Sequence, residues 1–252
     1  MIASQLADKL KRGIPAMGVI TVFDDPSLLE VAGPVGDFTW LDMQHGAVRM
    51  DRLPSLIRTC ELLGTAALVR PPGHSRQEIS VVLDWDAAGV IVPQVDTAEQ
   101  AAELVRAAKF PPLGDRSYGG HRVIARQGAD YAERVNAEQL LIVQLESPTA
   151  VGNADTLAST PGVDCLMLAP ADLRLRLGVP QTASLACEEV MDAARQVVAA
   201  CRRHDKLAMG LVFEPDDVRR FIAAGFNLMV AATLSRFVQQ GAEAARRMFD
   251  AL

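Results

Sequence analysis

The stretch Leu140-Leu141-Ile142-Val143-Gln144-Leu145-Glu146 is an apolar run that ends in a carboxylate. A second apolar run begins at Val163 and leads to Asp172, which lies 26 residues after Glu146 (172 − 146). A continuous apolar run of this length is typical of a strand that is covered on both faces, as in a parallel sheet. A charged side chain at the exit of such a strand needs a partner, for example a cation. The two runs therefore indicate two buried strands whose ends form a candidate metal site.

Eight apolar, β-rich runs divide the chain, and segments with helical periodicity lie between them. The runs cover residues 17–22, 38–43, 66–70, 89–95, 140–146, 163–169, 207–213 and 227–232. The helical segments cover residues 1–13, 52–63, 75–87, 97–108, 150–159, 188–204, 215–224 and 235–252. This alternation is typical of parallel strands joined by crossover helices. Because 252 residues suit one large core, we predict an α/β fold, a single (β/α)8 TIM barrel that occupies residues 1–252.

One long segment, residues 110–136, has no clear periodicity and is rich in Gly, Pro and Arg. We interpret it as an irregular loop. A loop of this length inside a compact domain usually has a function, and His121 is its candidate histidine.

The charge and hydropathy of the chain exclude several classes of protein. A formal charge of −6 argues against a nucleic-acid partner, which requires clustered Lys and Arg. No segment reaches the roughly 20 apolar residues of a membrane span, and residues 1–13 lack the features of a secretory signal. We therefore expect a cytoplasmic enzyme that acts on small molecules.

Polar residues follow several of the predicted strands at their carboxyl ends, where the active site of a barrel lies. Glu146 and Asp172 offer hard oxygen ligands, which suit Mg²⁺, Mn²⁺ or Co²⁺. Each acid could instead cap the helix that follows it. Gln144 precedes Glu146 on the same strand and is a candidate supporting hydrogen-bonding group.

Arg70 and His45 also follow strands and are candidates for the same site. A guanidinium at this position can bind a carboxylate in two places, although it could instead form a structural ion pair with Asp42 or Asp84. A histidine can exchange a proton near neutral pH. Asp84 could orient the ring of His45 and stabilise its charged form.

Seven motifs, in this order, resemble the HpcH/HpaI family of metal-dependent pyruvate aldolases, which includes 2-keto-3-deoxy sugar-acid aldolases. The motifs are WLDMQHG at 40–46, VRP at 69–71, LD at 83–84, VPQVDTAEQA at 92–101, FPPLGDR at 110–116, VQLES at 143–147, and PGVD at 161–164 leading into PADL at 170–173. The chain departs from the family pattern at Gln44, Ala169, Arg174 and Ala232, positions that bear on the shape of the substrate pocket.

The resemblance implies a barrel of the phosphoenolpyruvate/pyruvate type, in homo-oligomers (trimers or hexamers) that exchange the last helix. It implies that Glu146 and Asp172 bind the metal and that Arg70 binds pyruvate. His45 is then the catalytic base, supported by Asp84. The resemblance also implies that Gln144, Ala171 and Asp172 belong to the substrate-binding site.

The reaction implied is the reversible cleavage of a 2-keto-4-hydroxy acid into pyruvate or hydroxypyruvate and an aldehyde, through a metal-stabilised enolate. This is a class II aldolase, in which no strand-end lysine is needed; Lys109 and Lys206 lie elsewhere. The sequence leaves two alternatives open. One is a citrate-lyase-like acyl-CoA lyase, and the other is a non-catalytic metabolite-binding barrel.

Overall fold

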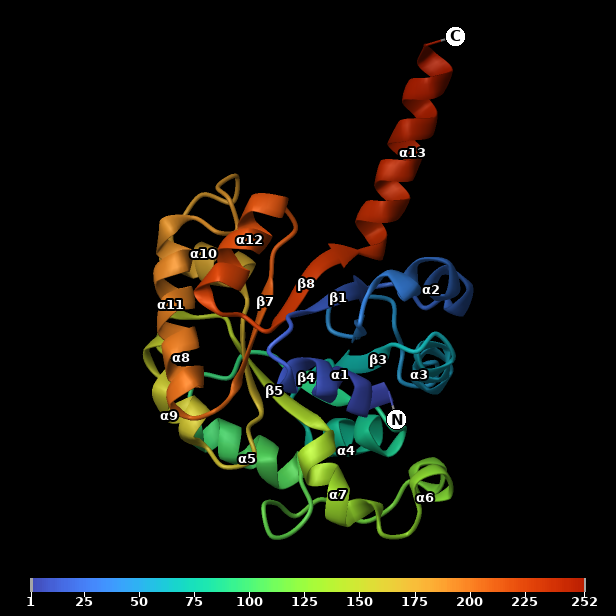
Figure 1. The fold of residues 1–252 in the computed structure, drawn as a ribbon, viewed down its shortest axis with the longest axis vertical. Helices are drawn as coiled ribbons and strands as arrows, with labels where there is room; N and C mark the ends of the chain where they lie inside the picture. Colours follow the sequence, from blue (N-terminus) through green and yellow to red (C-terminus); the bar gives the residue numbers. More distant parts are fainter. Residues whose placement is uncertain (1, 252) are drawn as a thin grey trace.

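The computed structural model describes residues 2–251, which form a closed barrel of eight parallel strands in sequential order (Figure 1). The strands are β1 (Ala16–Thr21), β2 (Phe38–Asp42), β3 (Ala66–Arg70), β4 (Gly89–Val92), β5 (Leu140–Leu145), β6 (Cys165–Leu168), β7 (Leu207–Leu211) and β8 (Leu228–Thr233). Pairing of β8 with β1 closes the sheet. The predicted barrel and all eight predicted strands are confirmed.

Most of the helices lie around the outside of the barrel, and the last helix projects away from it (Figure 1). They are α1 (Ile2–Lys11), α2 (Pro26–Ala32), α3 (Leu53–Leu62), α4 (Arg76–Asp84), α5 (Ala98–Ala108), α6 (His121–Gln127), α7 (Tyr131–Glu138), α8 (Pro148–Gly152), α9 (Ala154–Ser159), α10 (Pro170–Leu177), α11 (Glu188–Arg203), α12 (Pro215–Ala224) and α13 (Leu234–Asp250), with a 3-10 helix η1 (Gly33–Val35). None of the described helices is long and apolar enough to cross a membrane.

The prediction of an irregular loop over residues 110–136 is wrong in its second half, which contains α6 and part of α7. Gly120 and Gly128 bound α6 and have φ values of 84° and 92°. Glycine adopts this left-handed region without steric cost, so each one can end a helical turn sharply. With only seven residues between the two glycines, α6 is too short to show a clear helical period in the sequence.

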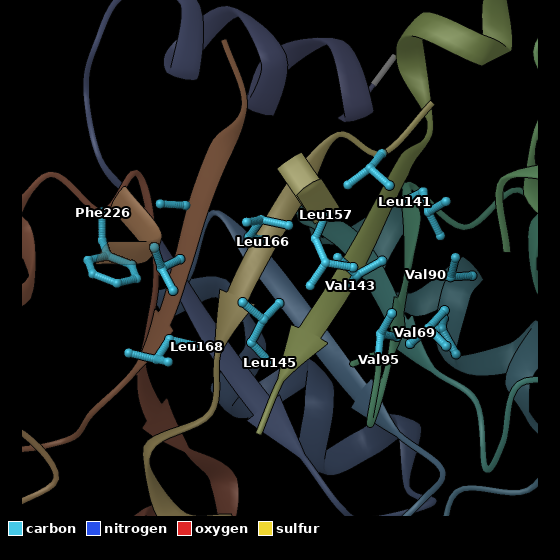
Figure 2. Close-up of a cluster of buried hydrophobic side chains, with 14 of the residues drawn as sticks. Val69, Val90, Val95, Leu141, Val143, Leu145, Leu157, Leu166, Leu168 and Phe226 are labelled. Atoms are coloured by element: carbon cyan, nitrogen blue, oxygen red, sulfur yellow. The ribbon is translucent and has the colours of Figure 1, made fainter. Parts of the chain in front are cut away.

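The strands bury side chains on both faces, as their continuous apolar sequences predict. On the outer face, Val143 and Leu145 of β5 lie beside Leu166 and Leu168 of β6 in the layer between sheet and helices (Figure 2). On the inner face, residues such as Phe38, Trp40, Leu68, Ile91, Ile142 and Met167 fill the barrel. Alternate residues along one strand therefore point into the barrel.

This alternation determines which polar side chains reach the mouth of the barrel. Asp42 follows Trp40 in the inward series of β2, and Arg70 follows Leu68 in that of β3. On β5 the inward series runs from Ile142 through Gln144 towards Glu146, the first residue after the strand. The strands therefore bring candidate residues from three separate segments to one end of the barrel.

The opposite end of the barrel shows how closely the interior is packed. Gly18 on β1 pairs in register with Phe38 on β2, and a Cβ added to Gly18 would overlap the Phe38 ring. We therefore expect Gly18→Ala to reduce the free energy of unfolding by about 1–3 kcal/mol, the usual effect of overpacking a core. Urea unfolding measures the change.

Phe38→Leu in the Gly18→Ala background should recover part of the loss, because the smaller side chain relieves the overlap. Gly152→Ala is the matched control, since a Cβ there meets nothing within 4 Å. A Gly18→Ala protein as stable as the wild type would contradict the packing described for this layer.

Candidate active site at the barrel mouth

An ion pair between Asp42 and Arg70 lies at the mouth of the barrel. The two residues are register partners at the ends of β2 and β3. The Nε and Nη2 atoms of Arg70 donate to the two carboxylate oxygens of Asp42 at 2.8 and 2.6 Å, and both side chains are buried. Of the two possible ion-pair partners, Arg70 therefore pairs with Asp42, whereas Asp84 pairs with Arg116. Nη1 of Arg70 has no hydrogen-bond partner in the described part of the chain.

Asp42 also shapes the loop that follows β2. Its Oδ1 accepts the backbone N–H groups of Gln44 at 3.1 Å and His45 at 3.4 Å. One carboxylate therefore holds both the guanidinium of Arg70 and the loop that carries His45. The sequence indicated Asp42 as a possible partner of Arg70, but its contact with the loop after β2 depends on backbone geometry that no motif shows.

Glu146 and Asp172 are the two acids at the mouth. Glu146 is buried directly after β5, and Asp172 is exposed in the first turn of α10. Burial raises the pKa of Glu146 above its ordinary value, and the negative charge of Asp172 raises it further. The positive charges of Arg70 and Arg176 lower this pKa by smaller amounts, so both guanidinium groups act on the same site.

The helix-cap interpretation of these acids is wrong. Ser147, not Glu146, caps α8, because its Oγ accepts the N–H of Ala150 at 2.9 Å. The N-cap position of α10 is Ala169, and no side chain there makes a capping hydrogen bond. Neither carboxylate caps a helix or forms an ion pair with a described Lys, Arg or His, and a backbone N–H of Gln94 lowers the pKa of Glu146 only slightly.

The residues at this mouth fit a hard divalent cation. Gln144 supplies a buried Oε1 atom without a hydrogen-bond partner among the described residues, on the same inward series as Glu146. Carboxylate and amide oxygens are the ligands that Mg²⁺ and Mn²⁺ prefer. Nowhere in residues 2–251 does a group of three His, Cys, Asp or Glu side chains gather as a metal cage. Two carboxylates and one amide oxygen leave further positions of such an ion open for a substrate.

The remaining predicted site residues divide between the two ends of the barrel. His45 and Ala171 are exposed at the mouth, on the loop after β2 and in the first turn of α10. Asp84 ends α4, which runs back towards the start of β4, and its Oδ1 accepts a hydrogen bond from Arg116 at 2.8 Å. The interpretation that Asp84 orients His45 within one chain is therefore wrong, because crossover helices run antiparallel to the strands.

Arg174 is a further residue near the mouth whose role sequence reasoning missed. It is buried, and its guanidinium donates to the carbonyl of Ala183 and to Oε1 of Gln181, the latter at 3.3 Å. Arg174 therefore holds the loop after α10 against the helix that carries Asp172. An arginine two residues after a strand-end acid could have indicated this role.

Comparisons with known proteins give a consistent result. The sequence model of the HpcH/HpaI aldolase/citrate lyase family matches residues 23–238. The chain is 30% identical to a 2-keto-3-deoxy-L-rhamnonate aldolase of Klebsiella pneumoniae over 244 residues, which are 95% of this chain and 91% of that protein. It is 36% identical to a 4-hydroxy-2-oxovalerate aldolase of Novosphingobium aromaticivorans over 173 residues, 68% of this chain and 66% of that protein.

Among solved structures, an HpcH/HpaI aldolase/citrate lyase family protein of Burkholderia cenocepacia superimposes with a TM-score of 0.87 at 26% identity. The superposition covers 98% of this chain and 99% of that one.

The raised pKa of Glu146 leads to a prediction about stability. Above that pKa, the ionised carboxylate is less favourable in the folded than in the unfolded protein, so Glu146→Gln should raise the thermal midpoint in EDTA at pH 7. The difference should vanish below the unfolded pKa of about 4.3, where Glu146 is protonated in both states. Thermal unfolding at the two pH values measures this.

Added Mn²⁺ should reverse this difference and give the wild type a higher thermal midpoint than Glu146→Gln. At about 100 times its dissociation constant, a cation that binds only the folded state stabilises it by about 2.7 kcal/mol. The wild type should gain this stabilisation and Glu146→Gln should lose most of it. Equal stabilisation of both proteins by Mn²⁺ would show that Glu146 is not a ligand.

Proposed function

This chain belongs to the HpcH/HpaI aldolase/citrate lyase family, and from this premise we propose the reaction that its barrel mouth performs. The protein is an aldolase that cleaves a 2-keto-4-hydroxy acid reversibly into pyruvate or hydroxypyruvate and an aldehyde. Relatives that align with most of the chain are named as aldolases of 2-keto acids. The observation that supports the reaction best is the convergence of Glu146, Asp172 and Gln144 with the partly free guanidinium of Arg70.

Arg70 binds the carboxylate of the 2-keto acid in this proposal. Asp42 uses the Nε and Nη2 edge of the guanidinium, so the Nη1 group is left to donate to a substrate oxygen. A charge-assisted hydrogen bond of this kind is stronger than a neutral one. Ala171 lies in the first turn of α10, beside Asp172, and lines the substrate pocket.

Glu146 and Asp172 would hold a divalent metal, Mg²⁺, Mn²⁺ or Co²⁺, and Gln144 would support them from inside the barrel. When bound, the cation would supply positive charge that favours enolate formation from the 2-keto acid. The raised pKa of Glu146 has the same origin as this role: a buried carboxylate beside another acid favours any bound positive charge.

His45 moves the proton in this proposal. In the cleavage direction it accepts the proton of the C4 hydroxyl as the C3–C4 bond breaks, and the bonding electron pair remains on the enolate while the aldehyde leaves. A proton then returns to C3 to give the methyl group of pyruvate. Asp42 positions the His45 loop through the backbone, so the histidine is exposed at the mouth and free to reach the substrate.

The placement of the lysines supports this enolate chemistry over a Schiff base. Lys109 is buried after α5, where its Nζ donates to Asp164 at 2.6 Å and to two backbone carbonyls. Lys206 precedes β7 at the amino end of the strands. The acyl-CoA lyase alternative is weaker, because the named relatives of at least 30% identity are aldolases.

Proton exchange tests the proposed function directly. Incubated with pyruvate in D₂O, the protein should exchange the methyl protons in the presence of Mg²⁺ or Mn²⁺, and NMR should show the methyl signal disappear. Glu146→Ala or Asp172→Ala should abolish the exchange. His45→Ala should retain metal binding but lower the rate of cleavage by roughly 10²–10⁴, the usual contribution of an acid–base residue.

Asp192→Asn, on the exposed surface of α11, is the control for a lost carboxylate and should behave like the wild type. If no divalent metal supports exchange with pyruvate or hydroxypyruvate, the proposed function is refuted.

We also propose that the enzyme is a homo-oligomer, a trimer or hexamer, in which α13 packs on a neighbouring subunit. Figure 1 shows α13 projecting away from the barrel. Its exposed side chains include Phe237, Val238, Met248 and Phe249, which recur at helical spacing on one face. An apolar stripe of this length on an isolated helix is typical of an interface.

Light scattering after gel filtration tests the assembly. The double variant Met248→Asp/Phe249→Asp should reduce the mass to that of a monomer, because it places two charges in the stripe. Gln240→Asp, which adds a charge outside the stripe, should not. A monomeric wild-type protein would contradict the proposed assembly.

A further inference from the structure

Trp40 lies inside the barrel beneath the guanidinium of Arg70. On the β2–β3 ladder, Trp40 is level with Leu68, and Asp42 is level with Arg70. Trp40 and Arg70 are therefore diagonal neighbours, and both belong to the inward series of their strands. The Cζ atom of Arg70 lies 4.7 Å from the centroid of the indole ring. This distance is well within the range of a cation–π interaction.

Trp40 and Asp42 contact different parts of the same guanidinium. Asp42 binds the Nε and Nη2 edge at 2.8 and 2.6 Å, and this contact lies in the guanidinium plane. The Cζ atom of the same group lies over the indole ring. Together the two contacts restrict the movement of the group, and only 8% of the Arg70 side chain remains exposed. The unpaired Nη1 is thus presented in one direction.

The indole is itself immobile. Trp40 is 1% exposed and belongs to the apolar cluster inside the barrel, which also contains Phe38 and Leu68. Its Nε1–H has no acceptor in the described part of the chain, so no hydrogen bond determines where the ring lies. Packing and the stacked guanidinium determine it instead. The aromatic face, not the N–H group, is therefore the feature that Arg70 uses.

We propose that Trp40 is a positioning residue for substrate binding, which holds the Arg70 guanidinium in the orientation that receives the carboxylate of the 2-keto acid. This inference rests on the proposed function, because it assumes that Arg70 binds that carboxylate. A guanidinium that is already fixed loses less conformational freedom when the substrate binds. The indole therefore contributes to affinity without contacting the substrate.

Substitution of Trp40 tests the inference by the response of KM. Trp40→Leu removes the aromatic face and should raise KM for the 2-keto-4-hydroxy acid by about tenfold, with kcat changed by less than about threefold. Trp40→Phe keeps an aromatic face without the N–H, and its KM should stay within about threefold of the wild type. A KM in Trp40→Leu equal to that in Trp40→Phe would overturn the inference.

The chain offers a matched control in its other tryptophan. Trp85 also lies beneath an arginine, with the Cζ atom of Arg58 5.8 Å from its ring centroid, but it follows α4 at the opposite end of the barrel from the mouth. Trp85→Phe should leave KM unchanged. Pyruvate exchange in D₂O, measured on every variant, separates failure of the proposed function from failure of the role of Trp40. Absence of exchange in the wild type refutes the proposed function, whereas exchange with an unaltered KM in Trp40→Leu refutes only the role of Trp40.

A second measurement does not depend on whether Trp40→Leu folds. The chain has two tryptophans, so Trp85→Phe leaves Trp40 as the only one. Because Trp40 touches the group that binds the substrate, saturating pyruvate with Mg²⁺ should change its fluorescence intensity or emission maximum. The same titration of Trp85→Phe/Arg70→Lys should give no change at these concentrations. Unchanged Trp40 emission in a Trp85→Phe protein that still exchanges pyruvate protons would overturn the inference.

Discussion

The ion pair between Asp42 and Arg70 is the interaction on which the rest of the barrel mouth depends. It joins the ends of two neighbouring strands, and the same carboxylate receives two backbone N–H groups from the loop that carries His45. Both charges are buried, so removal of either partner would leave the other uncompensated, which typically destabilises a protein by about 3–5 kcal/mol. The position of the guanidinium and the path of the histidine loop therefore form one unit, and neither can change alone.

The acids on the other side of the mouth have the opposite character. Glu146 and Asp172 have no ion-pair partner among the described residues, and each charge disfavours the other. The barrel thus combines a fully compensated pair on β2 and β3 with an uncompensated pair after β5 and β6. The first pair is neutralised within the chain, whereas the second leaves negative charge that favours a cation, because a site that binds a positive charge must lack one of its own.

Strand positions and the mouth residues could be predicted from sequence because they depend on local patterns. An apolar run that ends in Glu146 identifies a buried strand, and the alternation along it puts Gln144 and Glu146 on one face. The role of Asp84 could not be predicted this way. Its position depends on the direction of α4 and on the partner Arg116, which comes from a segment that two glycines break into pieces too short to show a helical period. The stacking of Trp40 on Arg70 depends on strand register, which no single run reveals.

The alternation along β5 also limits how such a site can evolve. Ile142, Gln144 and Glu146 face inward only because each is two residues from the next. A deletion or insertion of one residue within β5 would turn the amide and the carboxylate towards the helices and bring Val143 and Leu145 into the mouth. New specificities in this lineage should therefore arise by substitution and by changes in the lengths of the loops after the strands. Gaps in an alignment of its descendants should avoid the strands themselves.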